Sequence, residues 1–138
     1  MSTLAEIEAR LDALPAPADP SAAARELLAH AEAVLEHWVA ARGEAPTAAE
    51  REGFRLLALH RQGARGEPSF NACRETCREI AYHYNLIHAE PGAAAAAQAI
   101  RMMAMLVKHL TLFVSGKLQV AGLGEFCCSS RPLRIESA

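Results

Sequence analysis

Residues 70–87 read FNACRETCREIAYHYNLI, and the spacing of their apolar side chains decides the fold. These side chains follow one another at intervals of three and four residues: Phe70, Cys73, Cys77, Ile80, Tyr84 and Ile87. Such spacing places them on one face of an α-helix, which we predict over residues 69–88. A continuous apolar stripe of this kind packs against another helix, so the stretch predicts a helical bundle.

The rest of the chain agrees with an all-α fold. Of its 138 residues 51% are hydrophobic and only 5% aromatic, and Ala, Leu, Glu and Arg dominate, which favours helices. A chain of this length is typical of a single domain and is long enough to bury a hydrophobic core. We therefore predict a single all-α domain over residues 1–138, a compact bundle of four to five helices with a short N-terminal helix and an irregular C-terminal tail. The expected helices are 3–14, 20–42, 47–62, 69–88 and 93–115, and the tail is 117–138.

Capping residues and glycines suggest where these helices begin and end. Asp19 or Ser21 suits the N-cap of the second helix, and Pro20 suits its first turn. Residues 47–50 read TAAE, the form of a capping box, and are expected to open the third helix. Gly116 is expected to end the last helix. The tail beyond it is rich in apolar residues, so we expect it to lie along the bundle or across a second subunit.

Residues 93–115 are long and apolar enough to suggest a membrane span. Gln98, Arg101, Lys108 and His109 interrupt the stretch, and each basic side chain at the bilayer centre costs about 2.5–3.5 kcal/mol. We interpret it instead as the central helix of a soluble bundle and expect no membrane partner. The N-terminus shows no basic segment followed by an apolar one, so a cytoplasmic location is expected.

Charge argues against a nucleic-acid partner. The formal net charge is −2, and acidic and basic residues are interspersed along the chain. A protein that neutralises many phosphates needs a basic face. Nucleic-acid binding is therefore not expected.

The four cysteines are the first candidate site. Cys73 and Cys77 lie one helical turn apart within the apolar stripe, and Cys127 and Cys128 are adjacent in the tail. Without an export signal they are expected to be reduced thiols. We interpret Cys73 and Cys77 first as small core residues, and no cofactor is predicted. The alternatives are a metal site, which would take zinc or iron, and a redox pair.

Arginines form the second candidate site, at the junction of the third and fourth helices: Arg55, Arg61, Arg65, Arg74 and Arg78. Arginines around a helix N-terminus near Ser69 can bind an anion, and we assign that role to Arg61, Arg65, Arg74 and Arg78. Glutamates are interspersed among them, so ordinary surface ion pairs are the alternative interpretation. No glycine-rich phosphate loop is present in the sequence.

Tyr82, His83 and Tyr84 are the third candidate, as the lining of a pocket for a small molecule. The sequence has no GxSxG motif and only two aspartates, Asp12 and Asp19, so an enzyme is not favoured. The leading hypothesis is a non-enzymatic helical interaction or regulatory module that forms a homodimer and binds a protein partner. The alternatives are a thiol-based metal-binding or redox-sensing protein, and a protein that binds a small molecule or anion near the third and fourth helices.

Overall fold

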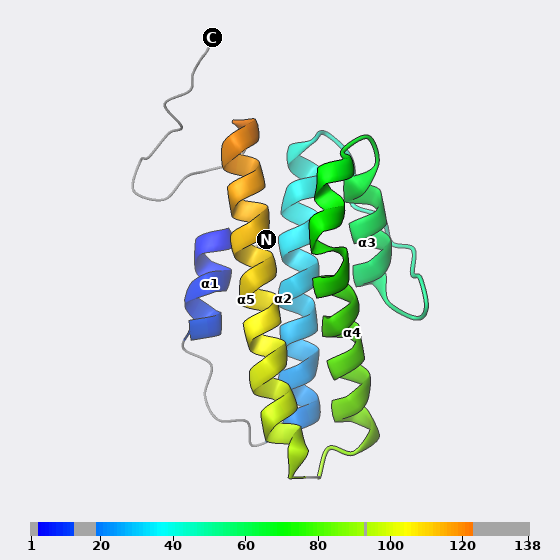
Figure 1. Cartoon of the computed structure of the whole chain (residues 1–138), viewed down its shortest axis with the longest axis vertical. Helices are drawn as coiled ribbons and strands as arrows, with labels where there is room; N and C mark the ends of the chain where they lie inside the picture. The colour runs from blue at the N-terminus through cyan, green and yellow to red at the C-terminus, as the bar shows by residue number, and fades with distance from the viewer. Residues whose placement is uncertain (1–2, 13–18, 93, 123–138) are drawn as a thin grey trace.

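The computed structural model describes residues 3–12, 19–92 and 94–122 and confirms the predicted all-α bundle. In chain order the elements are α1 (Leu4–Asp12), α2 (Pro20–Ala41), α3 (Arg55–Ala64), the 3-10 helix η1 (Pro68–Cys73), α4 (Arg74–Ala89) and α5 (Ala95–Ala121). Helices α2, α4 and α5 run side by side along the long axis (Figure 1). The short helix α1 packs on α5 and α2, while α3 packs on α2 and α4.

The first two helices follow the sequence closely. Helix α1 is the predicted short N-terminal helix, and the predicted residues 13–14 at its end lie outside the described residues. Asp19 is the N-cap of α2, because its carboxylate accepts hydrogen bonds from the backbone N–H groups of Ser21 at 3.1 Å and Ala22 at 3.3 Å. Pro20 occupies the first turn, where its missing N–H group has no cost.

The third helix begins later than predicted. It starts at Arg55, so the predicted start at residue 47 is wrong. The Thr47 hydroxyl accepts a hydrogen bond from Ala49 N at 3.0 Å, which closes a short turn instead of capping a helix. The Thr47 N–H group, which a helix would leave free, donates to Oε1 of the buried Gln62 at 2.8 Å.

A tight turn over residues 51–54 is the main reason for this late start. Arg51 and Phe54 exchange both backbone hydrogen bonds at 2.9 Å. Between them Glu52 has φ of 54° and Gly53 has φ of 85°, the left-handed pair that a two-residue hairpin turn requires. Helix propagation cannot pass through two such residues. The turn brings Arg51 back beside the beginning of α3.

The fourth predicted helix, 69–88, is two elements in the structure. The 3-10 helix η1 leads directly into α4, and Cys73 is both the last residue of η1 and the N-cap of α4. The apolar stripe of the sequence faces inward as predicted, with Tyr84 half-buried and the other five residues buried. Phe70 from this stripe stacks on Trp38 of α2, with ring centroids 4.8 Å apart.

The fifth helix runs past its predicted end. It continues through Gly116 to Ala121, and Gly122, with φ of 72°, follows as the C-terminal stop. A glycine inside a helix costs about 1 kcal/mol relative to alanine. Leu118, only 4% exposed, is buried by the added turn, and this burial offsets that cost. The rest of the predicted tail, 123–138, lies outside the described residues.

Helix α5 is the one described helix whose length and composition would allow it to cross a membrane. It packs against α2, α4 and α1, and 44% of its most apolar stretch is buried. The core helix of a soluble protein can have the same length and apolar composition as a membrane-spanning helix. The interpretation of α5 as the central helix of a soluble bundle therefore stays a prediction.

Candidate functional site

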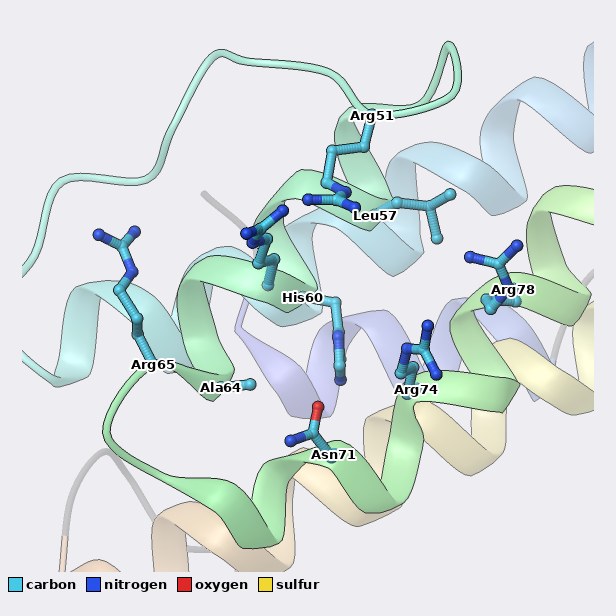
Figure 2. Close-up of a pocket in the computed structure, with 9 residues that line it drawn as sticks. Arg51, Leu57, His60, Ala64, Arg65, Asn71, Arg74 and Arg78 are labelled. Carbon is cyan, nitrogen blue, oxygen red and sulfur yellow. The ribbon is translucent and has the colours of Figure 1, made fainter.

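A cavity of about 480 Å³ opens between α3 and the segment where η1 joins α4. Five arginines and one histidine dominate its lining. The described residues that line it include no carboxylate and are Arg51, Leu57, His60, Arg61, Ala64, Arg65, Asn71, Arg74 and Arg78. Figure 2 shows the His60 ring projecting from α3 towards Asn71 and Arg74 on the opposite wall. We call this space the arginine cavity.

Helical spacing explains how distant residues meet here. Leu57, His60, Arg61 and Ala64 recur at intervals of three, one and three residues, and so share one face of α3. The opposite wall is built in the same way, because Asn71, Arg74 and Arg78 follow at intervals of three and four. The hairpin turn before α3 supplies Arg51, and Arg65 follows the end of α3.

Charge in the arginine cavity is unbalanced. Arg78 pairs with Glu52, whose carboxylate oxygens lie 3.3 and 3.4 Å from its guanidinium nitrogens. Within the described part of the chain, no carboxylate forms an ion pair with Arg51, Arg61, Arg65 or Arg74. Guanidinium groups that share a space without counter-charges repel one another and present planar pairs of N–H donors to an anion.

Arg55 does not belong to this cluster, although the sequence places it near. It turns to the other side of α3 and pairs with Glu36 and Glu32 of α2. Its Nε also donates to the Thr47 carbonyl at 2.8 Å, which helps to hold residues 47–54 against the bundle. Burial raises the pKa of Glu32, and the charge of Arg55 opposes that effect. Arg55 is therefore a structural residue.

His60 connects the arginine cavity with the core beneath it. The side chain is 5% exposed, and its ring stacks on Phe70 with centroids 5.5 Å apart. Its Nε2 lies 3.2 Å from the Phe70 carbonyl oxygen. Because a carbonyl oxygen only accepts, Nε2 carries the proton of this hydrogen bond. The same oxygen accepts a second hydrogen bond, from Cys73 Sγ at 3.3 Å.

The two thiols next to His60 have opposite pKa shifts. A hydrogen bond from Cys77 lowers the pKa of Cys73 from 9.0 to about 6, with a further lowering by His60 and an opposing effect of burial. The same hydrogen bond to Cys73, together with burial, raises the pKa of Cys77 above 9.0. Cys73 is the N-cap residue of α4, and its side chain makes no capping hydrogen bond there. These shifts make Cys73 the more acidic thiol of the pair, and in the structure its Sγ–H donates to the Phe70 carbonyl oxygen.

The structure places two of the four predicted cysteines, Cys73 and Cys77, in the core. Cys73 is 3% exposed and Cys77 is fully buried, whereas Cys127 and Cys128 lie outside the described residues. Among residues 3–12, 19–92 and 94–122 no group of three or more His, Cys, Asp or Glu side chains converges to hold a metal ion. A zinc or iron site that includes the tail stays a prediction.

The predicted pocket residues Tyr82, His83 and Tyr84 have different surroundings in the structure. Tyr82 is 61% exposed and lines a second cavity of about 350 Å³, which neither of the other two side chains lines. Nδ1 of His83 lies 2.8 Å from the Glu79 carbonyl oxygen on its own helix, and Tyr84 packs edge-on against Phe54 in the core. The rings of Tyr82 and His83 contact each other edge-on, with centroids 5.2 Å apart, whereas Tyr84 points into the core. A pocket formed by all three residues stays a prediction.

All four predicted anion-binding arginines, by contrast, line the arginine cavity: Arg61, Arg65, Arg74 and Arg78. The sequence interpretation missed Arg51, because it placed that residue inside a helix, and His60, because six histidines are scattered through the chain. A signal for His60 was present, since it lies three residues after Leu57 and one before Arg61, on the same side of α3. The anion-binding role of these residues stays a prediction.

Comparison with models of protein families, with curated proteins and with solved structures finds no match to this chain.

Proposed function

We propose that the protein is a non-enzymatic regulatory module that binds a small multivalent anion of the phosphate class in the arginine cavity. One observation carries the proposal: four arginines line a cavity in which the described residues offer them neither an ion-pair partner nor a carboxylate in the wall. These four arginines are exposed along one cavity, and a bound anion would relieve the repulsion between their positive charges.

The size of the cavity and the nature of its walls favour an organic phosphate or pyrophosphate. A volume of about 480 Å³ lies within the range typical of sites for small molecules. Guanidinium groups match the geometry of phosphate oxygens through paired N–H donors, and several of them are needed for a ligand with more than one negative charge. Arg65 and Arg78 stand at opposite ends of the cavity in Figure 2, so the positive charge extends along its length.

A binding role fits the cavity better than a catalytic one. Neither Cys73 nor Cys77 is among the residues that line it in the described part of the chain. His60 does line it, but its Nε2 is already engaged by the Phe70 carbonyl. The bound anion would act as a signal that draws the α3 wall and the η1–α4 wall together, which is a suitable input for a regulatory module.

Isothermal titration calorimetry with pyrophosphate tests this proposal. Arg61 and Arg74 come from opposite walls, so replacing each with glutamine removes one charged donor from each side. A hydrogen bond to a charged group is worth about 1.5–3 kcal/mol, so each replacement is expected to weaken binding about 10- to 100-fold. Raising the salt concentration is expected to weaken binding by the wild-type protein, since both partners are charged.

Arg101→Gln is the matched control. Arg101 is an exposed arginine of α5 that bonds Gln98 at 3.3 Å and does not line the arginine cavity, so this variant has the same loss of charge. It is expected to bind pyrophosphate as the wild type does. Equal weakening by Arg101→Gln and Arg74→Gln would show only a general attraction of the whole protein for anions. No heat of binding for the wild type at low salt would refute the proposal.

A further inference from the structure

The arginine cavity adjoins the second cavity, the one that Tyr82 lines. This second cavity has a volume of about 350 Å³, and Leu57 and Arg78 line both cavities. In Figure 2 these two side chains lie on the side of the arginine cavity away from Arg65. Each cavity has α3 or the turn before it on one side and α4 on the other. The two cavities therefore follow one another along a single groove between α3 and α4.

The two cavities have opposite charge. The arginine cavity contains four guanidinium groups with no ion-pair partner in the described part of the chain. The second cavity is lined by Glu52, Glu75 and Glu79, and we call it the glutamate cavity. Among the described residues only Glu52 of these three forms an ion pair, with Arg78. The groove thus has an excess of positive charge at one end and of negative charge at the other, with the Arg78–Glu52 pair between them.

The wall of the glutamate cavity suits an organic cation. Glu75 and Glu79 are exposed and lie one helical turn apart on α4. Phe54 and Leu57 add apolar surface, and the ring of Tyr82, 61% exposed, adds an aromatic face. An ammonium group is attracted both to carboxylates and to the face of an aromatic ring. Within residues 3–12, 19–92 and 94–122 no three His, Cys, Asp or Glu side chains converge on a metal ion, so these carboxylates are spaced for a larger cation.

We propose that the groove binds one bipolar ligand, an organic phosphate or pyrophosphate that carries a primary amine. Its phosphate end lies in the arginine cavity, and its amine, which is positively charged at neutral pH, lies in the glutamate cavity. The inference rests on the proposed function, because it assigns the anionic end to the same arginines. It adds the cationic end and the residues that recognise it, Glu75, Glu79 and Tyr82. A purely anionic ligand would gain nothing from these carboxylates and would be repelled by them.

Helix geometry gives the length of this ligand. Arg74 lines the arginine cavity, and Glu79 and Tyr82 of the glutamate cavity follow it by five and eight residues. These positions are therefore about 7–12 Å further along α4, at about 1.5 Å per residue. A chain of about six carbons between phosphate and amine spans this distance, since each carbon–carbon bond is about 1.5 Å long. A two-carbon chain is too short to take the amine past the Arg78–Glu52 pair.

Isothermal titration calorimetry of the full chain with two bisphosphonates tests the proposal. Both are pyrophosphate analogues with a six-carbon chain, which ends in a primary amine in one probe and in a methyl group in the other. All titrations contain EDTA, so that no metal ion can bridge a phosphonate and a carboxylate. One exposed ion pair changes affinity by up to about fivefold. We expect the amine to raise the affinity of the wild type about 5- to 25-fold, for one or two such pairs, and an amine on a two-carbon chain to give no such gain.

Glu79→Gln and Glu90→Gln are the matched variants. Each replaces one exposed glutamate with a neutral side chain of the same shape, but Glu90 follows the end of α4 and lines neither cavity. Glu79→Gln is expected to reduce the advantage of the amine about fivefold without weakening the amine-free probe. Glu90→Gln is expected to keep the full advantage. Tyr82→Leu is expected to reduce it about 2- to 5-fold, because the cation–π contact is lost.

The outcomes separate this inference from the proposed function. Equal affinities of the wild type for the two six-carbon probes would overturn the inference, while the binding of both would still support the arginine cavity as an anion site. An advantage of the amine that is as large in Glu79→Gln as in the wild type would also overturn it, because the amine would then bind outside the glutamate cavity. Absence of binding heat with either probe would refute the anion site and the inference together.

Discussion

Gly63 of α3 offers a sharp test of the packing that positions the site. It lies in the third turn of α3 and is buried, and a Cβ atom added to it would lie 2.7 Å from Cδ1 of Trp38 and 3.1 Å from Cε2 of Phe70. Alanine in a helix is usually more stable than glycine by about 1 kcal/mol. At this position we expect the opposite sign, because the neighbours leave no space for a methyl group.

The magnitude follows from how firmly Trp38 is held. Its indole stacks on Phe70 at 4.8 Å, and its Nε1 donates to the Gly63 carbonyl at 2.9 Å, so the ring cannot retreat without losing both interactions. Overpacking a tight core costs about 1–3 kcal/mol, and a contact of 2.7 Å belongs at the upper end of that range. After the helix-propensity gain, Gly63→Ala is expected to lower the free energy of unfolding by about 2 kcal/mol.

Gly116→Ala is the matched control, and urea denaturation is the assay. Gly116 is an exposed residue inside α5, and a Cβ atom there would meet nothing within 4 Å. The same substitution is expected to raise the free energy of unfolding by about 0.5–1 kcal/mol. A Gly63→Ala variant as stable as the wild type would contradict the packing of Trp38 against α3. A destabilised Gly116→Ala variant would contradict the continuation of α5 through that residue.

Three further predictions concern the thiols and the assembly. The pKa of Cys73 is about 6 in the folded protein against 9.0 for a free thiol, so the unfolded chain binds more protons between these values. The pH-dependent part of the stability difference between wild type and Cys73→Ser should therefore grow as pH rises from 6 towards 9 and disappear below 6, as urea midpoints will show; a difference that does not change with pH would contradict the lowered pKa of Cys73. Cys77→Ala should lower the free energy of unfolding by about 1–2 kcal/mol in thermal or urea melts, because it leaves a small void at a fully buried position. We also propose a homodimer through the exposed apolar side of α5, where Met105 is 51% and Leu112 49% exposed. Light scattering should give a dimer mass at tens of micromolar for wild type and a monomer for Met105→Glu/Leu112→Glu, and a monomeric wild type would contradict it.

The apolar stripe shows which part of the fold could be predicted from the sequence. Its spacing of three and four residues depends only on helical geometry, so the inward face that η1 and α4 share was predicted correctly from Phe70 to Ile87. Local signals were less reliable where tertiary contacts compete with them. The capping box at residues 47–50 does not begin a helix, because the hairpin turn at Glu52 and Gly53 interrupts the backbone. The last helix does not end at Gly116, because its continuation buries Leu118.

The residues of the candidate site were likewise predicted only in part. Arg61 and Arg74 were assigned to one anion site because their helices were expected to meet at a short junction. Arg51 was missed because its place depends on a turn that the sequence interpretation read as helix. The link from His60 to Cys73 was missed because it depends on a shared hydrogen-bond acceptor, the Phe70 carbonyl, and no spacing in the sequence reveals a contact made through the backbone.

The most direct test of the arginine cavity is a titration with pyrophosphate followed by nuclear magnetic resonance of the arginine Nε–Hε groups. Each guanidinium gives its own signal, so the spectrum reports which arginines meet the anion. We predict saturable shifts for Arg61 and Arg74, together with Arg51, and an unchanged signal for Arg101 on α5. Shifts of equal size for all arginines, or none at Arg61 and Arg74, would contradict the account.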